Sequence, residues 1–216
     1  CRTSYESNPS LAVSDRFLQL RRENQDIVGW LQLGGLEAPV MQRDNTYYQT
    51  HDRTGAYSAL GAPYLHSAVV LKHPPENLLV FGNSGGGAVF DELLRYQSGG
   101  ADYVRQNAFF TLDTVYESSQ YVVFAVFQAD TNPASSLYFS TTSYLTFPTD
   151  KAFQSYVAAA ANRSLYRVAV DVAPTDGLCT LCTTGQSGGT SRLIVLARRL
   201  RSGESTTQAP QITLSE

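Results

Sequence analysis

A glycine-rich run in the middle of the chain has the spacing of a serine nucleophile turn. Gly82-Asn83-Ser84-Gly85-Gly86 fits the pattern G-x-S-x-G, in which a tight turn between a strand and a helix exposes the serine. Hydrolases with this turn place their acid and their histidine after the serine in the chain. Here all the histidines come before Ser84: they are His51, His66 and His73. We therefore interpret the glycines as a turn and do not expect Ser84 to be a nucleophile.

Two further patterns suited to ligand binding are incomplete. The glycine run lacks the Lys-Ser/Thr ending of a P-loop and the G-x-G-x-x-G spacing of dinucleotide sites. Cys179-Thr180-Leu181-Cys182 has C-x-x-C spacing, but a zinc site needs a second such pair or partner histidines. Because positions three apart in a strand point to opposite faces, we interpret Cys179 and Cys182 as buried free thiols. We therefore expect neither a cofactor nor a metal ion.

The histidines and one arginine have structural interpretations on local sequence. His51 lies in a polar, aromatic stretch, residues 47–52, where a hydrogen-bonding role is favoured over a ligand role. His66 and His73 flank an apolar segment and are expected to face solvent or to cap a turn. Arg192 opens the apolar segment Leu193-Ile194-Val195-Leu196 and by itself indicates a cation at a strand edge.

The elements that must position these residues are mostly strands. Ser14 is the expected N-cap of a first helix that ends near Asn24, and Thr149 is the expected N-cap of a long helix to about residue 162. A shorter helix is expected over residues 88–96. Alternating apolar and polar residues, bounded by turn-forming residues, predict strands. They are expected over residues 27–33, 38–42, 64–72, 78–82, 109–115, 121–129, 177–184 and 192–200. Because strands do not alternate regularly with helices, we expect a closed or nearly closed mixed β-barrel.

Composition narrows the class of protein further. The chain has 216 residues, which favours one domain, and 43% hydrophobic residues, which is typical of a globular fold. The net charge of −3 and the absence of a basic stripe disfavour nucleic-acid binding. No apolar run approaches the roughly 20 residues of a membrane-spanning helix. Cys1 has two interpretations: the lipidated first residue of a mature lipoprotein, or simply the point where the sequence begins.

Several stretches share their order and spacing with a known family. They are residues 24–33, 39–42, 44–48, 51–52, 79–82 with Phe90, Leu93 and Tyr96, 153–156 through 164–166, 180–184 and 192–195. Together they resemble class B sortases, the cysteine transpeptidases of Gram-positive cell surfaces. The resemblance spans about residues 14–200.

The resemblance implies a fold and a division of the chain. The fold is a sortase-like mixed β-barrel of about seven or eight strands, with an N-terminal helix and a long helix before the last two strands. The family domain would cover residues 14–202, after an N-terminal tail, residues 1–13, that carries the lipid if Cys1 is an anchor. Residues 203–216 are polar and are expected to form a disordered C-terminal tail.

At two of three key positions this chain departs from the family. Where the family has its catalytic histidine, the chain has Asn83, and where it has its cysteine, the chain has Thr184. The arginine is retained as Arg192. In the family, the thiolate attacks a threonine carbonyl of a sorting signal, the histidine transfers protons, and the arginine stabilises the oxyanion or holds substrate. A threonine hydroxyl is a poor nucleophile without a base, and asparagine cannot transfer protons near neutral pH. We therefore expect the chain to be inactive.

Two alternatives to an inactive peptide-binding protein stay open. The first is an active, non-standard sortase or hydrolase that uses Cys182 or Ser84. In a shifted register Cys182, two residues before Thr184 and on the same strand face, would be its nucleophile. The domain could instead be purely structural, with a groove that binds no ligand. The partners that the resemblance implies are an extended peptide, such as the sorting signal of a surface protein, or an active sortase. The implied location is the extracellular face of the membrane or the cell wall.

Overall fold

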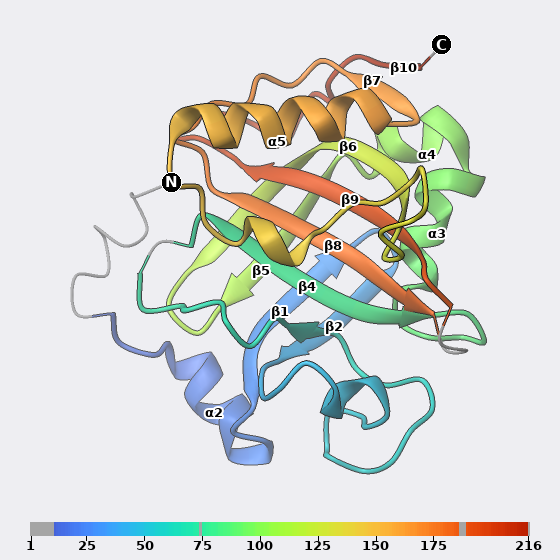
Figure 1. Cartoon of the computed structure of the whole chain (residues 1–216). Helices are drawn as coiled ribbons and strands as arrows, with labels where there is room; N and C mark the ends of the chain where they lie inside the picture. Colours follow the sequence, from blue (N-terminus) through green and yellow to red (C-terminus); the bar gives the residue numbers. More distant parts are fainter. Residues whose placement is uncertain (1–10, 74, 186–188, 216) are drawn as a thin grey trace.

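The computed structural model describes residues 11–73, 75–185 and 189–215, and Cys1 lies outside these ranges. Eight strands close into a barrel in the order β1-β2-β3-β4-β8-β9-β6-β5 (Figure 1). Their bounds are β1 Ile27–Leu33, β2 Leu36–Met41, β3 Tyr64–Leu65, β4 Asn77–Ser84, β5 Phe109–Thr114, β6 Ser118–Asp130, β8 Leu178–Gly185 and β9 Ser191–Arg199. The β2–β3 and β4–β8 pairs are parallel and the other pairs are antiparallel, so the barrel is mixed as predicted.

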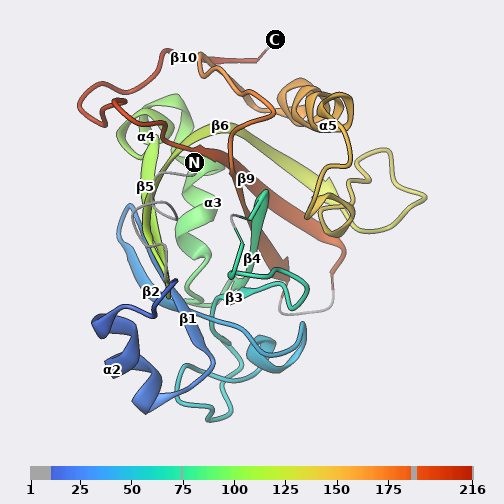
Figure 2. The ribbon, with the colours of Figure 1, turned by 90° about the vertical axis from the view of Figure 1, so that its left-hand side faces the viewer.

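Two buried clusters follow from the alternation of side chains along the strands. The barrel interior holds one cluster, which includes Leu31, Val80, Cys179 and Val195. The second cluster lies between the outer face of β4, β6, β8 and β9 and the helix α5, Asp150–Arg163. Figures 1 and 2 show α5 lying across this face, on the opposite side of the barrel from α2, Asp15–Glu23. The long helix therefore supports the strands β4, β6, β8 and β9 from outside.

The helix boundaries follow local chemistry. Ser14 and Thr149 are the N-caps of α2 and α5, as expected, and the Thr149 Oγ1 accepts a hydrogen bond from the Ala152 N–H at 3.1 Å. Two helices, α3 Asp91–Ser98 and α4 Gly100–Gln106, follow β4 where one was expected. Their buried side chains join the interior cluster of the barrel, which explains why the second short helix forms.

Two expectations differ from the structure. Only Tyr64 and Leu65 of the expected strand 64–72 form β3, because the chain turns at once, with Val69 N–H donating to His66 O at 3.0 Å. The expected disordered tail contains strand β10, Ile212–Leu214, which pairs with β7, Tyr166–Val168.

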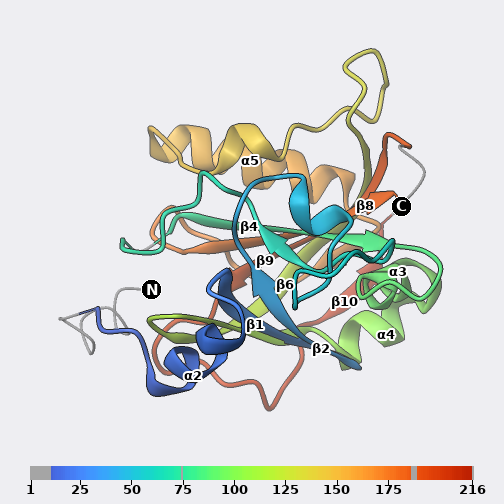
Figure 3. The same ribbon diagram turned by 90° about the horizontal axis from the view of Figure 1, so that it is seen from below.

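The C-terminal segment is ordered because burial and charge hold it. Ile212 is 5% exposed, and Glu204 accepts two hydrogen bonds of 2.7 Å from the Arg198 guanidinium. A polar composition alone did not reveal these contacts, since their partners lie on β7 and on the barrel strand β9. Figure 3 shows the barrel from below, with α3 and α4 together at one end. Among the described residues, no helix is long and apolar enough to cross a membrane.

Candidate functional site

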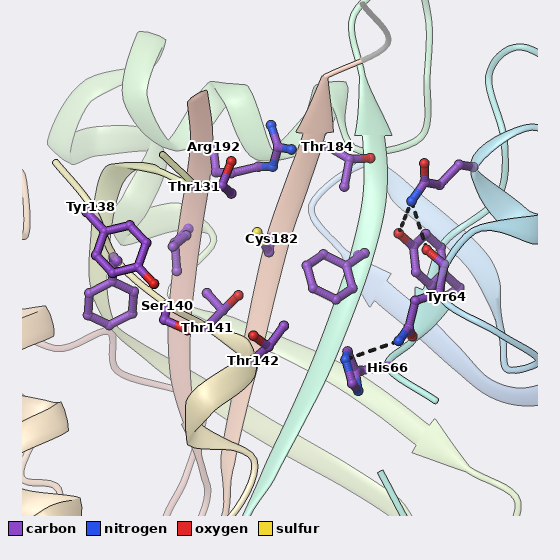
Figure 4. Close-up of a pocket in the computed structure, with 15 residues that line it drawn as sticks. Tyr64, His66, Thr131, Tyr138, Ser140, Thr141, Thr142, Cys182, Thr184 and Arg192 are labelled. Carbon is purple, nitrogen blue, oxygen red and sulfur yellow. Dashed lines mark hydrogen bonds between the residues drawn. The ribbon is translucent and has the colours of Figure 1, made fainter. Parts of the chain in front are cut away.

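A cavity of about 360 Å³ opens on the barrel surface beside the ends of β4, β8 and β9 (Figure 4). The strands supply Phe81, Cys182, Thr184, Arg192 and Ile194 to it. The other described lining residues come from the segments before β4 and after β6: Asn45, Gln49, Tyr64, His66, Thr131, Tyr138, Phe139, Ser140, Thr141 and Thr142. Three of the four predicted site residues, Cys182, Thr184 and Arg192, thus line one cavity, and Asn83 lies directly beside Thr184.

Asn83 and Thr184 are register partners in the parallel β4–β8 pair. The Thr184 Oγ1 hydroxyl donates to Asn83 Oδ1 at 2.7 Å. The Asn83 Nδ2 donates to Gln49 O at 2.8 Å and to Ala59 O at 3.3 Å, so its amide also ties the 49–59 segment to the barrel. Asn83 is 7% exposed. Neither side chain titrates near neutral pH, and the proton of Thr184 points at an amide oxygen that cannot accept it as a base.

Cys182 lies on the cavity side of β8 but is almost fully covered. Its exposed fraction is 2%, and its Sγ donates to Thr183 O at 3.6 Å. Burial raises the pKa of the Cys182 thiol to about 12, against a smaller lowering by the charge of Arg192. The thiolate is the reactive form of cysteine, so this environment disfavours nucleophilic attack near neutral pH.

The other cysteine of the C-x-x-C pattern lies on the opposite face of β8. Cys179 belongs to the interior cluster, whereas Cys182 belongs to the cluster under α5. Both thiols are free, as the strand geometry predicted. Among the described residues, no group of three or more histidine, cysteine or acidic side chains could hold a metal ion.

Arg192 brings a positive charge to the edge of the cavity. The side chain is half-buried at the start of β9, and its Nη1 donates to Gly189 O at 2.5 Å and to Ser191 O at 2.8 Å. Figure 4 shows its guanidinium between the ends of β9 and β8, on the side of Thr184. These backbone bonds hold the group in place without neutralising its charge.

His66 lies at the other end of the cavity. Figure 4 shows it well separated from Thr184 and Arg192. Its Nε2 lies 3.2 Å from Asn45 Nδ2, and its Nδ1 accepts from Ala68 N–H at 3.2 Å, which caps the turn after β3. Burial lowers the pKa of His66. Because the ring lies at the far end of the cavity, it does not take the place of a base beside Thr184.

The glycine run forms a closed turn rather than a nucleophile elbow. Its residues Gly85, Gly86 and Gly87 have positive φ values of 95°, 68° and 90°. The N–H groups of Gly85 and Gly87 donate to the Asp91 carboxylate, which fills the space that a phosphate would need. Ser84 ends β4 and is not among the described residues that line the cavity.

The wall opposite the strands was not found from the sequence. It consists of the segment after β6 and the short 3-10 helix η2, Thr142–Tyr144. Asn77, which is 1% exposed, donates through Nδ2 to Tyr144 O at 2.8 Å and accepts from the Thr180 hydroxyl at 2.9 Å. The run Ser140-Thr141-Thr142-Ser143 was the only available signal, and hydroxyl-rich runs are common in ordinary loops.

His51 has the structural role that its local sequence indicated. Its Nδ1 lies 2.8 Å from Tyr47 O, and its ring stacks on that of Tyr47 with centroids 3.9 Å apart. His51 is not among the described residues of the cavity.

Comparison with solved structures defines the class of fold. The chain superposes on the Staphylococcus aureus sortase B–substrate complex with a TM-score of 0.79 at 23% identity, covering 94% of each chain. It superposes on Clostridium perfringens sortase B with a TM-score of 0.74 at 22% identity, covering 86% of this chain and 100% of that one. The eight-stranded mixed barrel, with four α-helices among the described residues, is therefore a sortase-like fold.

Two curated proteins with similar sequences are both sortase B proteins. The chain is 25% identical over 195 residues to sortase B of Listeria monocytogenes serovar 1/2a, covering 88% of this chain and 76% of the relative. It is 26% identical to sortase B of Staphylococcus aureus strain NCTC 8325 / PS 47, with the same coverage. No protein-family model matches the chain. These relationships make the chain a distant homologue of sortase B.

Proposed function

We propose that this protein is a catalytically inactive, sortase-B-like protein of the cell surface that binds an extended peptide in the cavity beside Thr184. The observation that carries the proposal is the hydrogen bond between Thr184 and Asn83, at the positions that the resemblance assigns to the cysteine and histidine. The cell-surface location follows from the relationship to sortase B alone.

The chemistry of the two side chains supports inactivity. Acyl transfer needs a nucleophile and a group that moves its proton. The Thr184 proton is donated to Asn83 Oδ1, an amide oxygen that neither removes it nor returns it to a leaving amine. In a comparable catalytic unit, loss of one member lowers the rate by about 10⁴- to 10⁶-fold. Loss of both leaves negligible transpeptidation.

The shape of the cavity and the relatives support peptide binding. The cavity volume of about 360 Å³ lies within the range of small-ligand sites. One structurally similar protein is a sortase B–substrate complex, and another is sortase B complexed with triglycine. We propose the same kind of occupant here, an extended peptide of the sorting-signal type, presented by a surface protein or held in concert with an active sortase.

A second candidate function is an active, non-standard transpeptidase with Cys182 as its nucleophile. The observation that favours it is the position of Cys182 among the cavity residues, with the charge of Arg192 acting to lower its pKa. The larger effect of burial opposes it.

A cleavage assay tests the proposal against this alternative. A fluorogenic sorting-signal peptide and an amine acceptor are offered to the natural protein, to Asn83→His/Thr184→Cys, and to the Cys182→Ala form of each. We expect no turnover by the natural protein and measurable turnover by the double variant, unchanged by Cys182→Ala. Turnover by the natural protein that Cys182→Ala abolishes would establish the second candidate instead. The proposal also requires that the natural protein bind the intact peptide. We expect calorimetry to show saturable binding.

A further inference from the structure

The cavity carries a single formal charge. Among its described lining residues there is no aspartate, glutamate or lysine, and Arg192 is the only arginine. The remaining polar lining groups are neutral amides and hydroxyls, apart from His66, whose pKa is lowered by burial. Cys182 is neutral as well, because burial raises the pKa of its thiol. Near neutral pH the described lining of the cavity therefore holds one positive charge and no negative charge.

Within the described residues, the guanidinium of Arg192 has donors that no protein group engages. Its Nη1 is engaged by the carbonyl oxygens of Gly189 and Ser191, but within the described part of the chain no bond engages Nε or Nη2. The pKa of Asp130 is lowered mainly by a hydrogen bond from the Asn132 N–H. The nearby charge of Arg192 makes a smaller contribution to this lowering. That carboxylate accepts from Asn132 N–H at 2.7 Å, and no ion pair joins it to Arg192 in the described structure.

A threonine at position 184, in place of the cysteine that the resemblance implies, removes a possible anionic partner of Arg192. A hydroxyl stays neutral at every pH at which the protein is folded, so the position beside Arg192 supplies no anion. A guanidinium is always charged and binds carboxylates through paired, charge-assisted hydrogen bonds. Because no carboxylate of the described residues forms an ion pair with Arg192, the anion that its guanidinium can bind is one that the ligand brings.

Resting on the proposed function, we infer that the cavity binds the end of a peptide, with the C-terminal carboxylate held by Arg192 and the last side chains lying toward His66. Figure 4 shows Arg192 and Thr184 at one end of the cavity, with hydroxyl and aromatic side chains between them and His66. The hydroxyl of Thr142 and the rings of Tyr64 and Tyr138 offer hydrogen bonds and apolar surface to the residues before the carboxylate. The ligand class is thus a released peptide that ends in a free carboxylate.

Matched peptide pools test this inference. The probe is a pool of N-acetylated hexapeptides that end in threonine and are degenerate at the other positions, prepared as free carboxylates and as C-terminal amides. A third pool carries the amide end and one internal aspartate. Affinity selection with mass spectrometry ranks the pools on the natural protein, and calorimetry with single enriched peptides gives dissociation constants. Arg192→Gln and Arg192→Lys are compared with Arg22→Gln, an exposed arginine of α2.

We expect the amide to bind about 10- to 100-fold more weakly than the carboxylate, because it loses hydrogen bonds between charged groups. This factor corresponds to about 1.4–2.8 kcal/mol. Arg192→Gln should remove this preference, Arg192→Lys should retain part of it, and Arg22→Gln should leave it unchanged. Equal binding of carboxylate and amide would overturn the inference while leaving peptide binding in place. The internal aspartate pool could instead bind as tightly as the free-carboxylate pool, in a manner that depends on Arg192. That result would overturn the assignment of Arg192 to the C-terminal carboxylate. No binding by any pool would refute the proposed function as well.

Discussion

The Thr184 hydroxyl and the Asn83 amide, 101 residues apart in the chain, form a hydrogen bond of 2.7 Å between adjacent parallel strands. Asn83 also donates to Gln49 O and Ala59 O, so it joins two strands and a surface segment at one point. The pair is therefore part of the architecture beside the cavity, at the two positions that the sequence resemblance assigns to a cysteine and a histidine.

This arrangement predicts energetic coupling between the two residues. Asn83→Ala should lower the free energy of unfolding by about 1–3 kcal/mol, because it leaves buried polar groups without partners. Thr184→Val should cost less, and a double-mutant cycle should give a coupling energy of about 0.5–3 kcal/mol. Urea unfolding followed by the fluorescence of Trp30 measures these values. Thr213→Val, at an exposed position of β10, is the control, and strictly additive effects of Asn83→Ala and Thr184→Val would contradict the prediction.

Burial of Cys182 predicts poor thiol reactivity. A thiol with a pKa of about 12 exposes about 10³-fold less thiolate at pH 8 than one with its ordinary pKa near 9, in addition to the steric effect of burial. Iodoacetamide should therefore modify Cys182 in the native protein at least about 100-fold more slowly than in urea. Mass spectrometry of the peptide that contains Cys179 and Cys182 locates the modification. Native labelling at the unfolded rate would restore Cys182 as a candidate nucleophile.

The buried ion pair between Arg199 and Glu117 predicts a large loss of stability when it is broken. The carboxylate accepts from Nη1 at 2.7 Å and from Nη2 at 2.8 Å, with both side chains almost fully covered. Glu117→Ala should cost about 3–5 kcal/mol, since it leaves a buried guanidinium charge. Glu23→Ala removes the partner of Arg53 from an exposed pair and should change stability by less than about 1 kcal/mol.

If Glu117→Ala does not fold, Glu117→Gln offers a milder test of the same pair. This variant keeps a hydrogen-bond acceptor but removes the negative charge, so its cost should lie between those of the other two variants. Equal stability of Glu117→Gln and Glu23→Ala would show that the buried charge of Glu117 contributes little.

The ion pair between Glu204 and Arg198 predicts that the stability of the docked C-terminal segment depends on pH. The hydrogen bonds from Arg198 lower the pKa of Glu204 from 4.5 to about 2. A carboxyl with a lowered folded pKa stabilises the protein above its unfolded pKa, and that contribution is lost as the pH falls from about 5 toward 2. After allowance for partial exposure, Glu204→Gln should cost about 1–2 kcal/mol at pH 7.

The difference between Glu204→Gln and the natural protein should shrink when denaturation is repeated at pH 3. Asp102→Asn, which removes an 84% exposed carboxylate beside Arg105, should show no comparable change. A difference at pH 3 as large as that at pH 7 would contradict the assigned pKa of Glu204.

Short-range patterns in the sequence determined most of the secondary structure. The alternation of apolar residues placed β1, β4, β6, β8 and β9, and Thr149 marked the start of α5, because strand period and helix capping depend on neighbouring residues. The same period placed Cys179 and Cys182 on opposite faces of β8. The family resemblance singled out Asn83, Thr184 and Arg192 from the order and spacing of residues alone.

Only the tertiary structure decided what those residues contact. The bond from Thr184 to Asn83, the deep burial of Cys182 and the wall that Asn77 holds through Tyr144 all join segments far apart in the chain. The order of β10 has the same origin, since Ile212 pairs with Val168 of β7 and Glu204 binds Arg198 of the barrel strand β9. Sequence patterns record which face of an element is apolar, but strand register and the closure of the barrel determine which polar groups meet and which charge, here that of Arg192, faces the cavity.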